Sequence, residues 1–162
     1  MSKGLEGESG KLVQVCSVRV GEELYGILLG RILEIVGGAR PQTEPLAPDF
    51  IGGLVHYRGD VLTTVNLRRV LGMAPAGTTQ DLLVLEDAEG PFGLIVDSVR
   101  EVLTVSSADF EPKPSTVRKR KALFAGAFKL RDGLMVMLET TQLQPMRLAL
   151  MREGVEEPVC AR

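Results

Sequence analysis

The sequence repeats one pattern of short apolar segments in its two halves. Residues 25–36 read YGILLGRILEIV and residues 92–103 read FGLIVDSVREVL, so that an aromatic residue, a glycine and a glutamate coincide in the two stretches. Residues 51–58 and 124–131 form a second matching pair, and each turns through glycine and aspartate into a further apolar run. A duplicated set of short strands predicts two similar small β modules. Because two copies are too few for a solenoid, we expect them to pack on each other as one compact unit, with the cleft between them as the first candidate for a site.

Length and composition are those of an ordinary globular protein. The 162 residues are 44% hydrophobic and 25% charged, with a net charge of −2, which does not indicate a polyanionic partner. No stretch reaches the roughly 20 apolar residues that span a bilayer, and the polar, acidic first residues do not resemble a signal peptide. The two cysteines have neither disulfide nor metal-ligand spacing, and Cys16 alternates with Val18 and Val20, which predicts a buried thiol. The sequence therefore predicts a soluble cytoplasmic protein.

Short apolar segments separated by glycine, proline, aspartate and asparagine predict a mainly β fold. No connection holds the crossover helix of about a dozen residues that a parallel sheet requires, so small barrels are favoured over an open sheet. The apolar run at 30–36 fits a short helix that passes into a strand, and residues 109–120 are typical of a loop rich in proline and charge. Helices are expected at 67–71, capped by Asn66, and at 140–153. The expected strands are 11–20, 24–29, 53–57, 61–65, 82–85, 91–96, 124–130 and 134–138.

These segments predict one domain with short tails. Residues 1–10 are polar and rich in glycine, and we expect them to be disordered, while residues 154–162 are expected to form a flexible tail. Residues 11–153 then form a single domain. Its barrel subdomains span roughly 11–72 and 81–143, and the linker-like stretch between them leaves edge strands free to cross from one to the other.

The residue patterns of common enzymes are absent from the sequence. It contains no nucleophile elbow, phosphate-binding loop, dinucleotide-binding glycine motif or zinc-protease motif. His56, the single histidine, lies within an expected strand and is interpreted as a strand residue rather than as a catalytic base. Asp97 and Glu101 are four residues apart, and a solvated edge or an ion pair with Arg100 explains them more simply than paired catalytic carboxylates. We therefore predict no enzymatic activity, no cofactor and no bound metal.

One basic run supports an alternative function. Residues 118–121 are Arg-Lys-Arg-Lys, and four cations in a loop can meet the phosphates of a nucleic acid. Aromatic residues make up only 4% of the chain and none interleaves with this run, so a base-stacking platform is poorly supported. A small-barrel nucleic-acid-binding protein is therefore the alternative hypothesis, while a solvated loop is the simpler interpretation of the run.

Two charged residues point to protein binding. Arg58 directly precedes Gly59 at a tight turn between expected strands, where its guanidinium is presented at the rim of a module and can hold a carboxylate or a carbonyl. Glu34 lies between the apolar Leu33 and Ile35. The two charged side chains either pair with each other or with local charges, or they edge an apolar docking surface that Arg58 anchors.

Four short motifs occur in the order and at the spacing of one known family. They are residues 25–27 (YGI), 32–35 (ILEI), 50–62 (FIGGLVHYRGDVL) and 93–102 (GLIVDSVREV). Together they resemble the CheW family, the adaptor proteins of bacterial chemosensory arrays, over about residues 12–143. The sequence departs from the family pattern where His56 and Tyr57 replace asparagine and leucine, and where Thr63 and Asn66 replace proline and aspartate. These substitutions lie in the partner-facing region and fit a paralogue of a specialised chemosensory system.

The resemblance implies both a fold and a function. The family fold is two five-stranded SH3-like barrels packed on a shared core, with short helices and a C-terminal helix, and it carries no catalysis. The implied role is a scaffold that couples the cytoplasmic signalling tip of methyl-accepting chemoreceptors to the regulatory domain of a CheA-type histidine kinase. It implies association with membrane receptor arrays without membrane insertion, and no nucleic acid.

The resemblance also implies the partner-binding residues. Carried over residue by residue, they are Ile32, Glu34, Arg58 and Gly59 in the receptor-contacting region of the first barrel, and Val96, Asp97 and Val99 in the groove-facing signature of the second. Arg58→Ala is expected to weaken assembly and to leave the fold intact.

Overall fold

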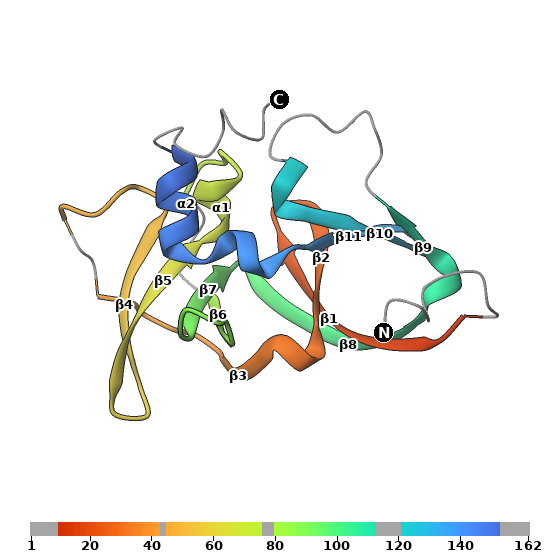
Figure 1. Ribbon diagram of the computed structural model, residues 1–162, viewed down its shortest axis with the longest axis horizontal. Helices are drawn as coiled ribbons and strands as arrows, with labels where there is room; N and C mark the ends of the chain where they lie inside the picture. Colours follow the sequence, from red (N-terminus) through yellow and green to blue (C-terminus); the bar gives the residue numbers. More distant parts are fainter. Residues whose placement is uncertain (1–9, 43–44, 76–79, 113–120, 153–162) are drawn as a thin grey trace.

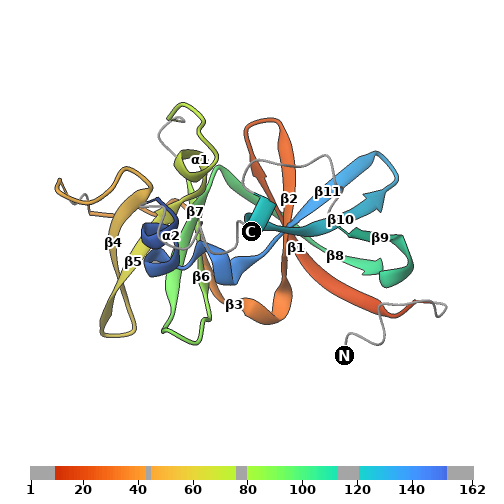
Figure 2. The same ribbon diagram turned by 45° about the horizontal axis from the view of Figure 1, so that its top comes forward.

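Two curved β-sheets lie side by side and make up most of the molecule (Figures 1 and 2). The structure is a computed structural model that describes residues 10–42, 45–75, 80–112 and 121–152. The predictions for residues 1–9 and 154–162 lie outside the described residues. The mainly β prediction is confirmed, and the short strands are joined largely as antiparallel hairpins, as their glycine turns favour.

Within the described residues one sheet has six strands and the other has five. The six-stranded sheet has the order β8 (Ser98–Ser106), β1 (Leu12–Val20), β2 (Glu23–Leu28), β11 (Gly133–Leu138), β10 (Phe124–Leu130) and β9 (Phe110–Pro112). The five-stranded sheet has the order β3 (Ile32–Val36), β6 (Asp81–Leu85), β7 (Phe92–Val96), β5 (Asp60–Asn66) and β4 (Ile51–Tyr57). The helical segments are η2 (Leu29–Arg31), α1 (Leu67–Val70), η3 (Ser107–Asp109), η4 (Lys121–Leu123), η5 (Thr140–Leu143) and α2 (Pro145–Arg152).

Each sheet takes strands from both halves of the sequence. β1 and β2 join β8–β11 in the six-stranded sheet, while β6 and β7 join β3–β5 in the five-stranded sheet. Two parallel pairs, β2 with β11 and β5 with β7, and two antiparallel pairs, β1 with β8 and β3 with β6, make these connections. The sequence stretches 11–72 and 81–143 are therefore interleaved in space, because strands borrowed from the other half pair edges that each half alone would leave open.

The repeated glycines of the duplicated pattern lie at these parallel pairs. Gly26 on β2 is opposite Met137, and Gly93 on β7 is opposite Thr64. A Cβ atom on Gly26 would lie 2.8 Å from Val15 Cγ1, and one on Gly93 would lie 2.9 Å from Thr64 Cγ2, both closer than packed atoms tolerate. The glycine is repeated because the same close approach of strands occurs once in each barrel.

The apolar side chains that the structure describes form three clusters, one inside each curved sheet and one between the sheets. Cys16 belongs to the cluster between the sheets with no exposed surface, which confirms the predicted buried thiol, and burial raises the pKa of that thiol. The six-stranded sheet encloses Val15, Val105, Phe128, Met135 and Met137, and the five-stranded sheet encloses Leu62, Leu82, Val84 and Ile95. The cluster between the sheets, which we call the shared core, includes Cys16, Val18, Ile27, Leu83, Leu85, Leu94, Val96 and Leu148.

The structure differs from the expected elements in three places. Strand β8 (Ser98–Ser106) was not among the expected strands, and it forms by pairing with β1. Residues 110–112 were expected in a loop, but they form β9, because Phe110 packs against Phe128 at 5.1 Å between ring centroids. A three-residue strand is too short to show alternation in the sequence, and it gives one barrel a sixth strand. The expected helix at 140–153 is divided into η5 and α2 at Gln144, since the residue before Pro145 avoids helical backbone angles.

Candidate functional site

Strand β3 is an edge strand that presents different side chains on its two faces. It follows η2 between the two sheets (Figure 1), and its pairing with β6 contains a bulge between Ile32 and Glu34. Residues opposite each other in antiparallel strands point to the same face. Ile32 and Ile35 lie opposite leucines of β6 that belong to the shared core. The bulge therefore puts Ile32 and Ile35 on one face although they are three residues apart.

Strand β8 brings two valines to the same side of the molecule. Val99 is opposite Val18 and Val102 is opposite Cys16, and both partners belong to the shared core. Ile32 and Val99 are half-buried and pack against this core, whereas Ile35 is 44% and Val102 is 48% exposed. We call these four residues the interbarrel seam, an apolar surface that both sheets contribute: Ile32, Ile35, Val99 and Val102.

Sequence reasoning missed two residues of the interbarrel seam. Strict strand alternation would place Ile32 and Glu34 on one face and Ile35 on the other. The bulge reverses the faces after Ile32, so Ile35 joins the seam instead. Val102 carries no sequence signal of its own, since its place on the seam follows from its pairing with Cys16 on β1.

Glu34 lies on the opposite face of β3, at the mouth of the five-stranded barrel. It is opposite Val84, whose side chain fills that barrel. Glu34 Oε1 is 4.0 Å from Arg58 Nη2, and the Arg58 guanidinium lies 5.3 Å from the centre of the Tyr57 ring. The Arg58 and Glu34 side chains are 74% and 43% exposed, so this ion pair adds little to stability and leaves the guanidinium accessible.

Arg58 occupies a backbone position that suits other residues better. Tyr57 and Asp60 are paired, and Arg58 and Gly59 between them have φ angles of 49° and 84°. Positive φ at both central residues is the pattern of a type I′ turn, in which Asn-Gly is preferred. Within the described ranges Arg58 is the single non-glycine residue with positive φ. An arginine in this strained position supports the prediction that its side chain serves a function.

Val96 and Asp97 lie at the junction of the two sheets. Val96 is 1% exposed and belongs to the shared core, the cluster on which the interbarrel seam packs. The Asp97 carboxylate accepts hydrogen bonds from Arg68 Nε at 2.8 Å and from the Gly21 N–H at 2.8 Å. Two interpretations of Asp97 were open from the sequence, a solvated edge and an ion pair with Arg100. Its ion-pair partner is instead Arg68, because the packing of α1 on the sheet holds Arg68 against Asp97.

The environment of Asp97 stabilises its ionised form. Partial burial raises the pKa of this carboxyl group, but the hydrogen bonds from Arg68 and the Gly21 N–H, together with the charge of Arg68, outweigh burial and hold the pKa below its ordinary value. Arg68 belongs to the five-stranded barrel and Gly21 to the β1–β2 turn of the other. Asp97 thus links the barrels, through an ion pair with Arg68 on one side and a hydrogen bond from the Gly21 N–H on the other.

The structure divides the seven predicted site residues into three groups. Because β3 is an edge strand, a partner that lies along its edge reaches residues on both of its faces. The roles carried over from the family remain predictions, and their places are these: Ile32 and Val99 on the interbarrel seam, Glu34, Arg58 and Gly59 at the barrel mouth, and Val96 and Asp97 at the junction.

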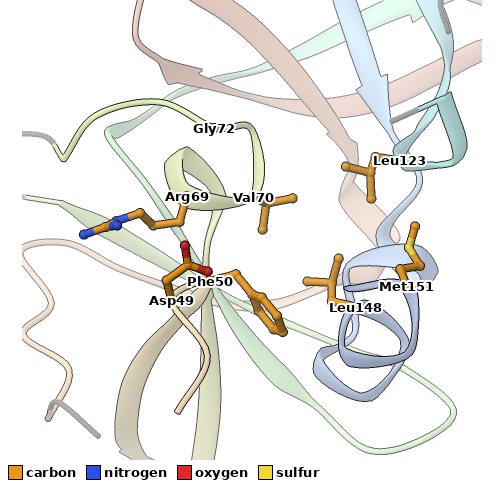
Figure 3. A pocket seen from close by; sticks show the side chains of 8 residues that line it. All are labelled: Asp49, Phe50, Arg69, Val70, Gly72, Leu123, Leu148 and Met151. Carbon is orange, nitrogen blue, oxygen red and sulfur yellow. The ribbon is translucent and has the colours of Figure 1, made fainter. Parts of the chain in front are cut away.

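A separate apolar cavity of about 340 Å³ lies between α1, α2 and η4 (Figure 3). Figure 3 shows Phe50 and Leu148 turned toward each other across it, with Asp49 and Arg69 at its side. Its lining includes no cysteine, histidine or hydroxyl group, and none of the predicted site residues. It offers no constellation for catalysis.

Other candidate chemistries find little support in the described residues. His56 is exposed on β4 opposite Val61. The described part of the chain contains no group of three or more acidic, histidine or cysteine residues placed to hold a metal ion. None of its helices has the length and apolar character needed to cross a membrane. Residues 118–120 of the basic run lie outside the described residues, so the nucleic-acid hypothesis stays a prediction.

Comparison with known proteins gives consistent matches. A family model described as a CheW-like domain matches residues 14–145. The chain is 30% identical over 127 residues to the chemotaxis protein CheW of Rhizobium meliloti (strain 1021), covering 77% of this chain and 82% of that protein. It is 25% identical over 138 residues to the chemotaxis protein CheW of Helicobacter pylori (strain ATCC 700392 / 26695), covering 84% of each. The crystal structure of the scaffolding protein TtCheW from Thermoanaerobacter tengcongensis matches with a TM-score of 0.76 and 25% identity, covering 82% of this chain and 92% of that chain.

Proposed function

The chain belongs to the family of CheW-like domains, and from this premise we propose that it is a non-catalytic adaptor that couples the signalling tip of a chemoreceptor to the regulatory domain of a CheA-type histidine kinase. A receptor tip lies at the cytoplasmic end of a membrane protein, so the adaptor acts in the cytoplasm beside the membrane without entering it. Its work is binding, and its residues need only supply complementary surfaces.

The interbarrel seam is the observation that carries this proposal. Ile35 and Val102 expose nearly half of their side chains although both are large and apolar, and they come from different sheets. A helix that lies along the seam removes this surface from water and contacts both barrels at once. The half-buried Ile32 and Val99 form the base of this binding surface and are already packed against the shared core.

The charged pair at the barrel mouth supplies orientation. Arg58 Nη2 and Glu34 Oε1 are 4.0 Å apart, on the face of β3 opposite the seam. A charged side chain of the partner can replace this weak contact and pair with either residue. A guanidinium offers several N–H groups in a fixed plane, which fixes the direction of a carboxylate or of carbonyl groups. We propose that Arg58 sets the register of the receptor helix and that the kinase domain binds at a barrel end.

Each contact in such an adaptor is expected to be modest. A receptor array presents many tips and many kinases at high local concentration, so weak pairwise binding still yields a stable assembly. The adaptor must therefore hold two partners at the same time, which two separate surfaces on one small fold allow.

Co-sedimentation with vesicles that carry a receptor signalling-tip fragment, with and without the kinase, tests the proposal. Arg58→Asn removes the guanidinium while keeping a residue that suits the type I′ turn. Arg131→Asn is the matched control, because Arg131 lies exposed in the two-residue β10–β11 turn of the other barrel.

We expect the wild-type protein and Arg131→Asn to sediment with the tip, and Arg58→Asn to bind it at least about tenfold more weakly. Wild-type protein that binds neither the tip nor the kinase would remove the coupling role and leave only the fold. Equal binding by Arg58→Asn and wild type would remove Arg58 from the site.

A further inference from the structure

One carboxylate joins the two strands that carry the interbarrel seam. Asp81 begins β6 of the five-stranded sheet, and its Oδ2 accepts a hydrogen bond of 2.8 Å from the N–H of Val99 on β8. Its Oδ1 accepts one of 3.3 Å from the N–H of Gly38, just after the end of β3. Both oxygens of a single side chain are therefore engaged by backbone from β8 and from the β3 segment.

One of these two hydrogen bonds crosses between the two sheets. Val99 is a seam residue of the six-stranded sheet, and Gly38 continues the strand that carries Ile32 and Ile35. A backbone hydrogen bond from the Ala39 N–H to the Gln80 carbonyl, 3.1 Å, holds the same segment beside β6. The Val99 N–H is the only one of these donors that belongs to the other sheet.

Asp81 and Asp97 both connect the barrels, but they bind different segments. Asp81 is opposite Val96 in the β6–β7 pairing, so the two carboxylates lie at the same end of that hairpin. Asp97 binds Arg68 and the β1–β2 turn, neither of which carries a seam residue. Asp81 binds the seam strands themselves.

We propose that Asp81 is a positioning residue that sets the spacing of the two halves of the interbarrel seam, and with it the affinity for the receptor helix. The inference rests on the proposed function above. If the two halves of the seam already have the correct spacing before binding, the binding free energy is not reduced by the cost of ordering β3 and β8 relative to each other. Asp81 does not need to touch the partner to act in this way.

Asparagine at this position removes one of the two hydrogen bonds. Its single side-chain oxygen accepts one N–H, while its amide group turns two hydrogens toward the other N–H. The hydrogen bond from either the Val99 N–H or the Gly38 N–H is then lost, and the two halves of the seam move independently. The side-chain volume is unchanged, so packing around Asp81 is kept.

The experiment compares Asp81→Asn with wild type and with Asp87→Asn. Asp87 is a matched control, because it also accepts a backbone hydrogen bond, from the Glu89 N–H at 2.9 Å, but lies in the β6–β7 turn at the other end of β6 and bonds neither Val99 nor the end of β3. Titration calorimetry measures the affinity of each protein for the receptor-tip fragment and, separately, for the kinase regulatory domain. Hydrogen exchange of the Val99 amide reports whether the cross-sheet bond is lost.

We expect Asp81→Asn to bind the tip about tenfold more weakly, to keep its affinity for the kinase domain within about twofold, and to exchange the Val99 amide faster than wild type. Asp87→Asn should match wild type in all three. A purely structural role would weaken both partners together, and that result overturns the inference. If Asp81→Asn does not fold, Asp81→Ser, which keeps one small acceptor, takes its place with the same expected result.

The experiment distinguishes failure of the proposed function from failure of the positioning role of Asp81. Wild-type protein that binds no receptor tip overturns the proposed function, and this inference falls with it. Wild-type protein that binds the tip, with equal binding by Asp81→Asn, overturns the positioning role alone.

Discussion

Replacing Asp97 by asparagine should loosen the junction of the two barrels. Its carboxylate accepts hydrogen bonds from the Gly21 N–H at 2.8 Å, from Arg68 Nε at 2.8 Å and from Arg68 Nη2 at 3.1 Å. Asparagine keeps the shape of the side chain but has one acceptor oxygen and no charge. The Arg68 guanidinium then faces an amide group in place of a carboxylate.

The expected loss of unfolding free energy follows from these contacts. Hydrogen bonds to charged groups contribute about 1.5–3 kcal/mol each, and the side chain of Asp97 is 21% exposed, so solvent screens part of this contribution. Because asparagine retains one acceptor, we expect a loss of about 2 kcal/mol in all. For a chain of this length that corresponds to a fall in melting temperature of about 4–8 °C.

The loss should depend on pH. The pKa of Asp97 is lower in the folded protein than in the unfolded chain, so its ionisation stabilises the fold at every pH above the unfolded value, about 4. As the pH falls below about 4, through the folded pKa, the carboxylate takes up a proton and this stabilisation disappears. The difference in unfolding free energy between wild type and Asp97→Asn should therefore be constant near neutral pH and shrink in acid.

Urea denaturation followed by circular dichroism measures this difference, since the chain has no tryptophan for fluorescence. Asp132→Asn is the control, because Asp132 lies exposed in the β10–β11 turn. It should match wild type at every pH. An Asp97→Asn variant as stable as wild type at neutral pH would refute the reasoning, as would a difference that persists unchanged in acid.

Three further changes have distinct expected outcomes. Arg58→Asn should change the unfolding free energy by less than about 1 kcal/mol, because relief of the positive φ offsets the lost ring and ion-pair contacts, while tip binding falls; a large loss of stability in thermal melts would make Arg58 structural. Ile35→Asp should weaken tip binding in the same sedimentation assay without lowering the melting temperature, and Leu12→Asp, on a residue 76% exposed away from the seam, should do neither. Gly53→Ala should cost about 2 kcal/mol or more in urea denaturation, because its φ is 119° and a Cβ atom would collide with the Gln42 carbonyl oxygen; wild-type stability would contradict this.

The sequence alone determined the kind of fold and the family. Strand length, turn residues and the repeat indicated two small barrels, because side-chain alternation and glycine preferences are local properties of the chain. The repeated Gly26 and Gly93 mark equivalent strands in the sequence itself, and both lie at close contacts between strands. The motifs around Glu34 and Arg58 identified the family, and the family model covers residues 14–145.

Only the tertiary structure decided how these parts meet. The parallel pairs that interleave the two halves join residues far apart in the chain, and no local pattern specifies such partners. The bulge in β3 moved Ile35 to the seam and Glu34 to the barrel mouth, since one extra residue reverses every later side chain. Asp97 found Arg68 rather than Arg100 because the packing of α1 brings that guanidinium within 2.8 Å, a distance set by the whole fold rather than by neighbours in sequence.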